Sequence, residues 1–97
     1  MDKIRLDKWL WQARFFKTRS LAARICGMKR VRVNGKRTNK AHLGVHVGQV
    51  LTFRQGNRIR VVKILGLGRR RGPAKEAESL YQDLSEGGTL PYLQSLI

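Results

Sequence analysis

Residues 31–38, VRVNGKRT, predict a tight β-hairpin, which marks where the sheet of this small domain begins. Valines alternate with basic residues, and Asn-Gly is the dipeptide most typical of a two-residue hairpin turn. With Asn34 and Gly35 in the turn, the register places three pairs opposite one another: Val31 and Thr38, Arg32 and Arg37, Val33 and Lys36. Like charges directly opposite each other destabilise a strand pair. The two guanidiniums therefore either stand solvated with their repulsion screened by salt, or hold a phosphate between their forked donors.

The charge distribution favours a polyanionic partner. The 97 residues include 21 Lys and Arg but only 6 Asp and Glu, which gives a formal net charge of +15. Between Lys8 and Lys75 there are 19 basic residues and no acidic one. A surface that only needed solubility would mix both signs, and a field of this strength attracts polyanions. Nucleic acid is the partner that the composition predicts.

Chain length and composition exclude several classes of protein. A chain of 97 residues forms one domain with a modest core, which leaves no room for a second, catalytic domain. No apolar run approaches the roughly 20 residues of a membrane helix, and the N-terminal segment lacks the apolar region of a secretory signal. The single cysteine, Cys26, allows no intrachain disulfide, and its place on a helix packing face predicts burial. We expect a cytoplasmic monomer without membrane contacts.

Hydrophobic periodicity predicts an α+β fold. Apolar residues recur at three- and four-residue spacings over 5–16 and 18–28, which predicts two packed helices with Thr18 as N-cap of the second. A two-residue period predicts further strands at 49–54 and 58–65 in a small, mainly antiparallel sheet. A connector at 66–72 then leads through Pro73 to a C-terminal helix at 74–85, and a short apolar tail follows from residue 87.

Basic residues cluster around the starts of the two N-terminal helices and the hairpin. A helix N-terminus adds its own affinity for anions. The candidate RNA-binding residues are Arg5, Lys8, Lys17, Arg19, Lys29, Arg30, Arg32, Lys36, Arg37 and Lys40. Asp7 lies among them, where it either favours the helix dipole or pairs with Arg19. The three arginines at 69–71 either extend this surface or form a solvated cluster in a linker.

Other patterns that could carry chemistry are weak. Trp11 and Phe15 can stack on an unpaired base, but a wider buried face of the first helix is the favoured interpretation. His42 and His46 lack both the helix and the further ligands that a zinc site needs. No phosphate-cradling loop is present, and no carboxylate lies within the basic stretch to act as a general base. We therefore predict no metal, no cofactor and no enzymatic activity.

The order of motifs resembles a known family. RLDKWL, TRSLAARI, VRVNGKR and then a glycine followed by QVLTF resemble the S4-like RNA-binding domain over about residues 5–54. RQGN at 54–57 and RRRGPAKEAESLY resemble one branch, the ribosome-associated heat-shock protein 15 family, which extends the match to about residue 86. The resemblance implies an S4-like RNA-binding domain at 1–66. At 67–97 it implies a basic linker, a C-terminal helix and a tail, all in one compact unit.

The resemblance also implies a function. Members of that family bind ribosomal RNA and the large ribosomal subunit, including subunits that keep a peptidyl-tRNA after premature dissociation, and act without catalysis in their rescue or recycling. It places the RNA face at the helix starts and the hairpin, which here means Arg5, Lys8, Lys17, Arg19, Arg30, Arg32, Lys36 and Arg37. An accessory RNA-binding module of an RNA-modifying or tRNA-related enzyme system, or a ribosome-assembly factor, remains the alternative.

Two departures from the family pattern stand out. Lys29 occupies a position, two residues before the first hairpin valine, where the family usually has glycine. If that position requires a positive φ, lysine is strained by about 1 kcal/mol or more. Better-known members also continue as a long basic extension, where this sequence has an apolar tail.

Overall fold

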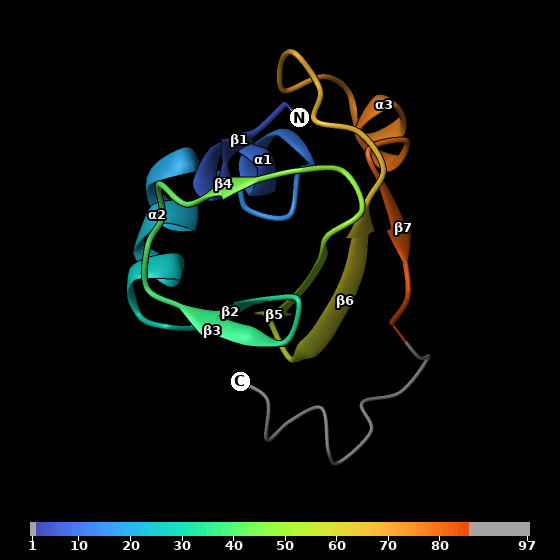
Figure 1. Ribbon diagram of the computed structural model, residues 1–97. Helices are drawn as coiled ribbons and strands as arrows, with labels where there is room; N and C mark the ends of the chain where they lie inside the picture. Colours follow the sequence, from blue (N-terminus) through green and yellow to red (C-terminus); the bar gives the residue numbers. More distant parts are fainter. Residues whose placement is uncertain (1, 86–97) are drawn as a thin grey trace.

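The hairpin at residues 31–38 forms with the predicted register, Arg32 opposite Arg37. The computed structural model describes residues 2–85. Its main sheet is antiparallel, and the strands in spatial order are β3 (Lys36–Thr38), β2 (Val31–Val33), β5 (Val50–Gln55), β6 (Arg58–Ile64) and β7 (Tyr81–Asp83) (Figure 1). The predicted α+β class with a mainly antiparallel sheet is confirmed.

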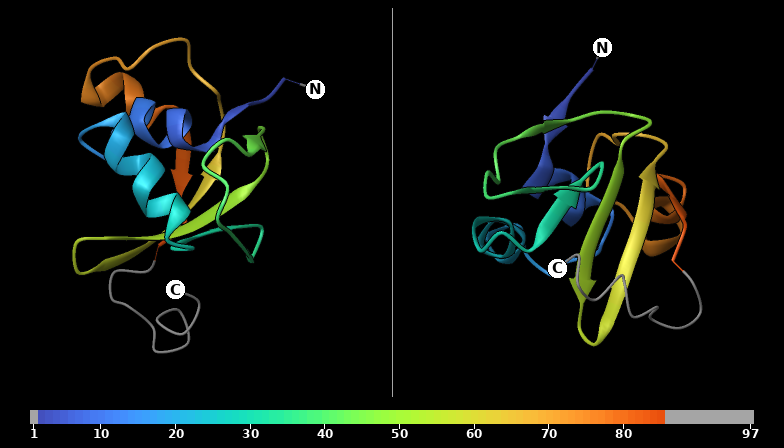
Figure 2. Two further views of the ribbon diagram at one scale, coloured as in Figure 1. Left: turned by 90° about the vertical axis from the view of Figure 1, so that its left-hand side faces the viewer. Right: turned by 60° about the horizontal axis from the view of Figure 1, so that its bottom comes forward.

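Two helices, α1 (Leu6–Gln12) and α2 (Arg19–Gly27), pack with the sheet around one apolar core (Figure 2). The hairpin valines, Val31 and Val33, belong to this core and are 0% and 8% exposed. Burial of a valine side chain stabilises a fold by about 1.5 kcal/mol or more, so the hairpin is anchored through one face and leaves its arginines on the other.

The start of α2 follows the sequence, but the end of α1 does not. The Thr18 hydroxyl accepts a hydrogen bond from the Leu21 backbone N–H at 3.0 Å, as the predicted N-cap should. The prediction that the first helix reaches residue 16 is wrong, since it ends at Gln12. Arg14 adopts a φ of 66° there. The Phe15 N–H donates a hydrogen bond to the Leu10 carbonyl, which closes a turn of six residues. This is the Schellman motif that ends many helices, formed without its usual glycine.

The end of α2 has the same geometry. Lys29 adopts a φ of 60°, its N–H bonds the Cys26 carbonyl at 3.0 Å, and the Arg30 N–H bonds the Ile25 carbonyl at 3.4 Å. Residue 29 therefore has the left-handed conformation that ends many right-handed helices. In that conformation any residue other than glycine lowers the stability of the fold by about 1 kcal/mol. Among residues 2–85, both helix ends with this geometry carry the cost, one at Arg14 and one at Lys29.

A two-stranded ribbon that the sequence did not predict joins the N-terminus to the segment after the hairpin. β1 (Ile4–Arg5) pairs with β4 (Gly44–Val45). The backbone N–H groups of Leu6 and Asp7 then donate to the carbonyls of Leu43 and Ala41, at 2.8 and 3.1 Å. The first turn of a helix has free N–H donors, and here the loop after the hairpin satisfies them. The start of α1 is thereby held beside the end of the hairpin.

The segment at 66–72, predicted as a connector, is tied to α1 and to Arg14 just after it by side-chain hydrogen bonds. Trp9 Nε1 donates to the Gly66 carbonyl at 2.8 Å, Gln12 Nε2 to the Leu67 carbonyl at 2.9 Å, and Arg14 Nε to the Gly72 carbonyl at 2.7 Å. Buried polar groups need such partners. The segment therefore forms a fixed cover over the helix.

The prediction of a helix at 74–85 is right only for its first turn. α3 covers Ala74–Glu78, and the chain then turns at Ser79 into β7 (Tyr81–Asp83), the edge strand beside β6. The Tyr81 ring packs against the Phe15 ring with centroids 4.6 Å apart. Pairing with β6 and this aromatic contact outweigh the helical spacing of the apolar residues. The apolar tail predicted from residue 87 lies outside the described residues.

Within residues 2–85, no helix has the length and apolar character needed to cross a bilayer.

Candidate nucleic-acid interface

A buried carboxylate organises the basic residues at the start of α1. Asp7 is 2% exposed and accepts two hydrogen bonds from Arg5, Nε to Oδ1 at 3.1 Å and Nη2 to Oδ2 at 3.0 Å. It also accepts from the Lys8 backbone N–H at 2.8 Å, and Arg19 Nη2 lies 3.9 Å from Oδ1. The predicted pairing of Asp7 with Arg19 is therefore present, with Arg5 as the closer partner. Both guanidiniums remain partly exposed and are held in place by one anion.

The hairpin presents its two arginines on the face opposite the core. Arg32 faces Arg37 across the strand pair, and the Arg32 Nη1 donates to the Gly35 carbonyl of the turn at 2.8 Å. That contact holds the Arg32 side chain along the hairpin. Arg32 is half-buried and Arg37 exposed. The contact of this pair with a phosphate stays a prediction.

A groove of about 410 Å³ lies between the hairpin and the loop that follows it. Three candidate residues line it, Lys36, Arg37 and Lys40, and none of its described lining residues is acidic. The Lys40 N–H bonds the Thr38 hydroxyl at 3.1 Å, and the Leu43 N–H bonds the Lys40 carbonyl at 3.1 Å, so the loop is ordered. The bonds of the Leu43 and Ala41 carbonyls to the start of α1 place this loop beside the helix start that carries the Arg5–Asp7 pair.

The remaining candidate residues lie on α1 or just before and after α2. Lys8 is half-buried on α1, and Lys29 is exposed at the left-handed end of α2. Lys17 and Arg30 line a second groove, between α2 and the β5–β6 turn, together with Arg54. The sequence prediction missed Arg54. Arg54 could have been found from the sequence, because it lies at the end of a predicted strand and inside the stretch without acidic residues.

Two of the three arginines at 69–71 have intramolecular partners. Arg71 donates from Nε to the Trp11 carbonyl at 3.2 Å and lies over the Trp11 ring, with its guanidinium carbon 5.8 Å from the ring centre. Arg70 forms an exposed ion pair with Glu76 at 3.1 Å. These contacts favour the interpretation of the run as a structural cluster over that of an RNA contact.

Of the two aromatic residues considered for base stacking, Phe15 belongs to the core, while Trp11 packs under Arg71. Phe15 is 5% exposed and packs against Phe53 and Tyr81, with ring centroids 4.9 and 4.6 Å away. The Trp11 ring is half-buried under Arg71. The favoured interpretation, a widened buried face, is confirmed for Phe15.

Cys26 is fully buried on α2. Burial, with a smaller contribution from the nearby Asp7 charge, raises the pKa of its thiol to about 12. A thiol in this state is a packing group and a poor nucleophile. Among residues 2–85 no group of three or more His, Cys, Asp or Glu side chains could hold a metal ion.

Comparison with known proteins places the chain in a family. The S4 domain family model matches residues 4–51. Heat shock protein 15 of Escherichia coli (strain K12) is 43% identical over 84 residues, which are 87% of this chain and 62% of that protein. The chain thus spans about three fifths of the length of such relatives. The RQC P-site tRNA stabilizing factor of Halalkalibacterium halodurans is 35% identical over 79 residues, 81% of this chain and 88% of that protein.

A solved structure agrees in both sequence and fold. The trimeric structure of Vibrio cholerae Heat Shock Protein 15 superposes with a TM-score of 0.80 at 41% identity, covering 84% of this chain and 82% of that chain. Identity of this size over most of both chains reflects common descent as well as a common fold. The chain belongs to the heat shock protein 15 family of S4-domain proteins.

Proposed function

We propose that this protein binds ribosomal RNA, without catalysis, through the surface formed by the start of α1, the start of α2 and the β2–β3 hairpin. The observation that carries the proposal is the hairpin itself. Arg32 faces Arg37 beside a groove lined by Lys36 and Lys40, with no acidic residue among the described lining residues. Forked guanidinium donors suit phosphate oxygens, and contacts to phosphates position a protein on RNA. The proposed contact residues are Arg5, Lys8, Lys17, Arg19, Lys29, Arg30, Arg32, Lys36, Arg37 and Lys40.

The target we propose is the large ribosomal subunit, in the rescue or recycling of subunits that stalled or dissociated early. The name of one relative supports a ribosomal setting: the RQC P-site tRNA stabilizing factor, since the P site is a tRNA site of the ribosome. A peptidyl-tRNA on the subunit is accordingly a proposed neighbour. Residues 1–66 supply the RNA contacts in this proposal, and 67–97 support them, since 66–72 are bonded to α1.

We propose a cytoplasmic monomer as the active form. The Vibrio cholerae relative was solved as a trimer, so the mass of the protein in solution is the direct test of this point. A single mass of about 11.1 kDa supports the monomer, and a threefold mass contradicts it.

Sedimentation tests the target. Purified protein is added to a cell extract, separated on a density gradient and located by immunoblotting. We expect it with free large subunits. Recovery with small subunits, or only at the top of the gradient, contradicts the proposal. A variant with Arg32→Ala and Arg37→Ala should move to the top, while the matched variant Arg69→Ala with Lys75→Ala, which loses the same charge, should stay with large subunits.

The alternatives give different outcomes. An assembly factor would travel with precursor particles that lack late ribosomal proteins, which mass spectrometry of the fractions would detect. An accessory module of an RNA-modifying system would increase a modified nucleoside when added with its enzyme to RNA.

A further inference from the structure

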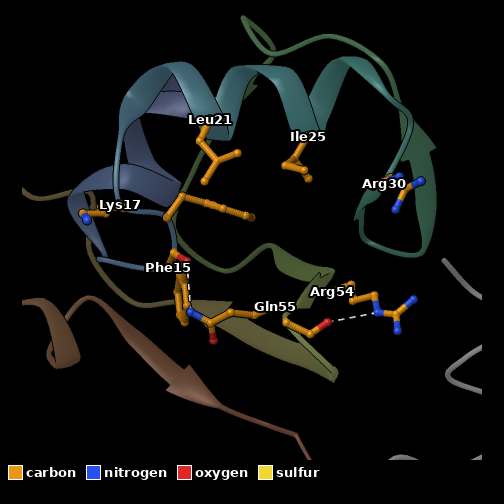
Figure 3. Close-up of a pocket in the computed structure, with 9 residues that line it drawn as sticks. Phe15, Lys17, Leu21, Ile25, Arg30, Arg54 and Gln55 are labelled. Carbon is orange, nitrogen blue, oxygen red and sulfur yellow. Dashed lines mark hydrogen bonds between the residues drawn. The ribbon is translucent and has the colours of Figure 1, made fainter.

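A second groove, of about 490 Å³, lies between α2 and the turn that joins β5 to β6 (Figure 3). Its volume falls within the range of about 300–1,000 Å³ typical of small-ligand sites. Leu21 and Ile25 point from α2 toward the strand turn, and Phe16 adds to the apolar floor. The face of the hairpin described above does not include this groove.

The wall of the groove is fixed by hydrogen bonds. Gln55 Nε2 donates to the Phe15 carbonyl at 2.9 Å, and Gln55 Oε1 accepts from Arg60 Nη1 at 2.8 Å. The Arg60 side chain is 12% exposed and lies over the Phe15 ring, with its guanidinium carbon 5.1 Å from the ring centre. Gln55 thus ties the β5–β6 turn to Phe15 directly, through its amide N–H, and also through Arg60, which lies over the Phe15 ring. A groove held in this way keeps its shape before a ligand arrives, which lowers the entropy lost on binding.

Cations stand at both ends of this apolar floor. Lys17 lies at one end, and Arg30 and Arg54 lie at the other (Figure 3). Arg54 Nε donates to the Gly56 carbonyl at 3.1 Å, which orients its guanidinium along the strand turn. Within residues 2–85, none of these three cations takes part in an ion pair, and none of the described lining residues is acidic.

This pattern identifies the chemistry of the ligand. An unpaired nucleotide fits this pattern. Its base is flat and can pack on apolar side chains, and a negatively charged phosphate lies on either side of it. A base inside a duplex has its faces stacked and cannot enter. An uncharged apolar side chain of a protein would leave the three cations without a role. Charge complementarity therefore favours RNA as the occupant.

We propose that this groove takes one unpaired nucleotide of the bound RNA. The base lies on Phe16, Leu21 and Ile25, and the flanking phosphates contact Lys17 and the Arg30–Arg54 pair. The inference rests on the proposed function and extends it, because it gives a protein that otherwise contacts phosphates a preference for RNA with an unpaired base.

The test uses a stem-loop RNA with one bulged nucleotide and a second RNA in which that nucleotide is abasic. The two RNAs carry the same phosphates, so any difference in affinity reports the base. We expect the wild-type protein to bind the RNA with the base about fivefold or more tightly, the lower end of what stacking on a protein surface contributes. Equal affinities would overturn the inference, and salt-dependent binding of both RNAs would still leave the proposed function standing.

A matched pair of variants locates the contact. Leu21→Glu places a carboxylate on the groove floor, and Ser20→Glu places the same charge on the exposed neighbouring position of α2. Leu21→Glu should abolish the preference for the base, while Ser20→Glu should keep it; urea denaturation confirms that both are folded. A preference that survives in Leu21→Glu places the base elsewhere and refutes the groove. Absence of binding to either RNA by the wild-type protein refutes the proposed function itself.

Discussion

The Asp7 carboxylate holds the Arg5 guanidinium by two hydrogen bonds, at 3.1 and 3.0 Å, although the Asp7 side chain is 3% exposed and that of Arg5 51% exposed. One buried anion thus sets the direction of a surface cation. It also accepts from the Lys8 N–H, so it fixes the first turn of α1 at the same time. An acidic residue beside the proposed RNA surface thus serves to position that surface.

Replacement of Asp7 with Asn should lower the free energy of unfolding by about 1–3 kcal/mol. The amide keeps the size of the side chain, but it cannot accept both Arg5 bonds, and a lost bond to a charged group costs that much. Glu76→Gln is the matched control, since it removes the same charge from an exposed ion pair, where the loss should be below about 1 kcal/mol. Urea denaturation of both variants measures the difference. Equal losses would mean that Asp7 has no special positioning role.

Replacement of Lys29 with Gly should raise the free energy of unfolding by about 1 kcal/mol, because a φ of 60° strains every side chain with a Cβ. Arg14 has a φ of 66°, and its side chain bonds the Gly72 carbonyl. Arg14→Gly removes the same backbone strain but also loses this hydrogen bond. The free energy of unfolding of this variant should therefore stay unchanged or fall. Thermal denaturation of both variants decides the point; a destabilised Lys29→Gly would show that lysine makes a compensating contact.

Replacement of Trp9 with Phe should destabilise the fold by about 1–3 kcal/mol. Trp9 is fully buried, and its Nε1 satisfies the Gly66 carbonyl at 2.8 Å, which phenylalanine would leave without a donor. The half-buried Trp11 makes no such bond among the described residues, and Trp11→Phe should cost less than about 1 kcal/mol. Chemical denaturation of the two variants provides the comparison. A larger effect at Trp11 would contradict the description of 66–72 as a cover fixed through Trp9.

The Cys26 thiol should stay unreactive toward a thiol reagent at pH 8 in the native protein and react once urea unfolds it. Its pKa in the fold, about 12, lies above the ordinary value of 9.0. A raised pKa contributes stability that is complete below pH 9 and is lost as the pH rises toward 12. The stability difference between the wild type and Cys26→Ala should therefore narrow over that interval. Rapid native labelling would contradict the burial of Cys26.

Local signals predicted the hairpin, the α2 cap and the buried valines, because turn chemistry and alternation act between neighbouring residues. The end of α1 was not predictable in this way, because Arg14 carries no sequence mark of a left-handed conformation, which glycine would have supplied. For Lys29 the family pattern, with its usual glycine, had raised a positive φ, and the structure has it. Residues 81–83 form a strand because β6 offers an unpaired edge and Phe15 offers a ring, and both lie far away in the sequence.

The candidate surface was predictable as a charge pattern but not as an arrangement. The stretch without acidic residues identified the cations, while the bonds of Leu6 and Asp7 to residues 41 and 43, which bring the hairpin loop to α1, arise only in the fold. The second groove was missed for the same reason, since its floor and its cation Arg54 come from α2, the α1–α2 loop and β5.

The affinity for a ribosomal RNA fragment across a salt series tests the central claim most directly. If about six phosphates are contacted, the logarithm of the affinity should fall with the logarithm of salt at a slope near −5. Arg32→Ala with Arg37→Ala should bind at least about tenfold more weakly, with a slope shallower by about 0.7 to 0.9, because the pair holds one phosphate. Arg69→Ala with Lys75→Ala, of equal charge, should bind nearly as the wild type does. A wild-type slope near zero, or equal losses in the two double variants, would contradict RNA binding through the hairpin.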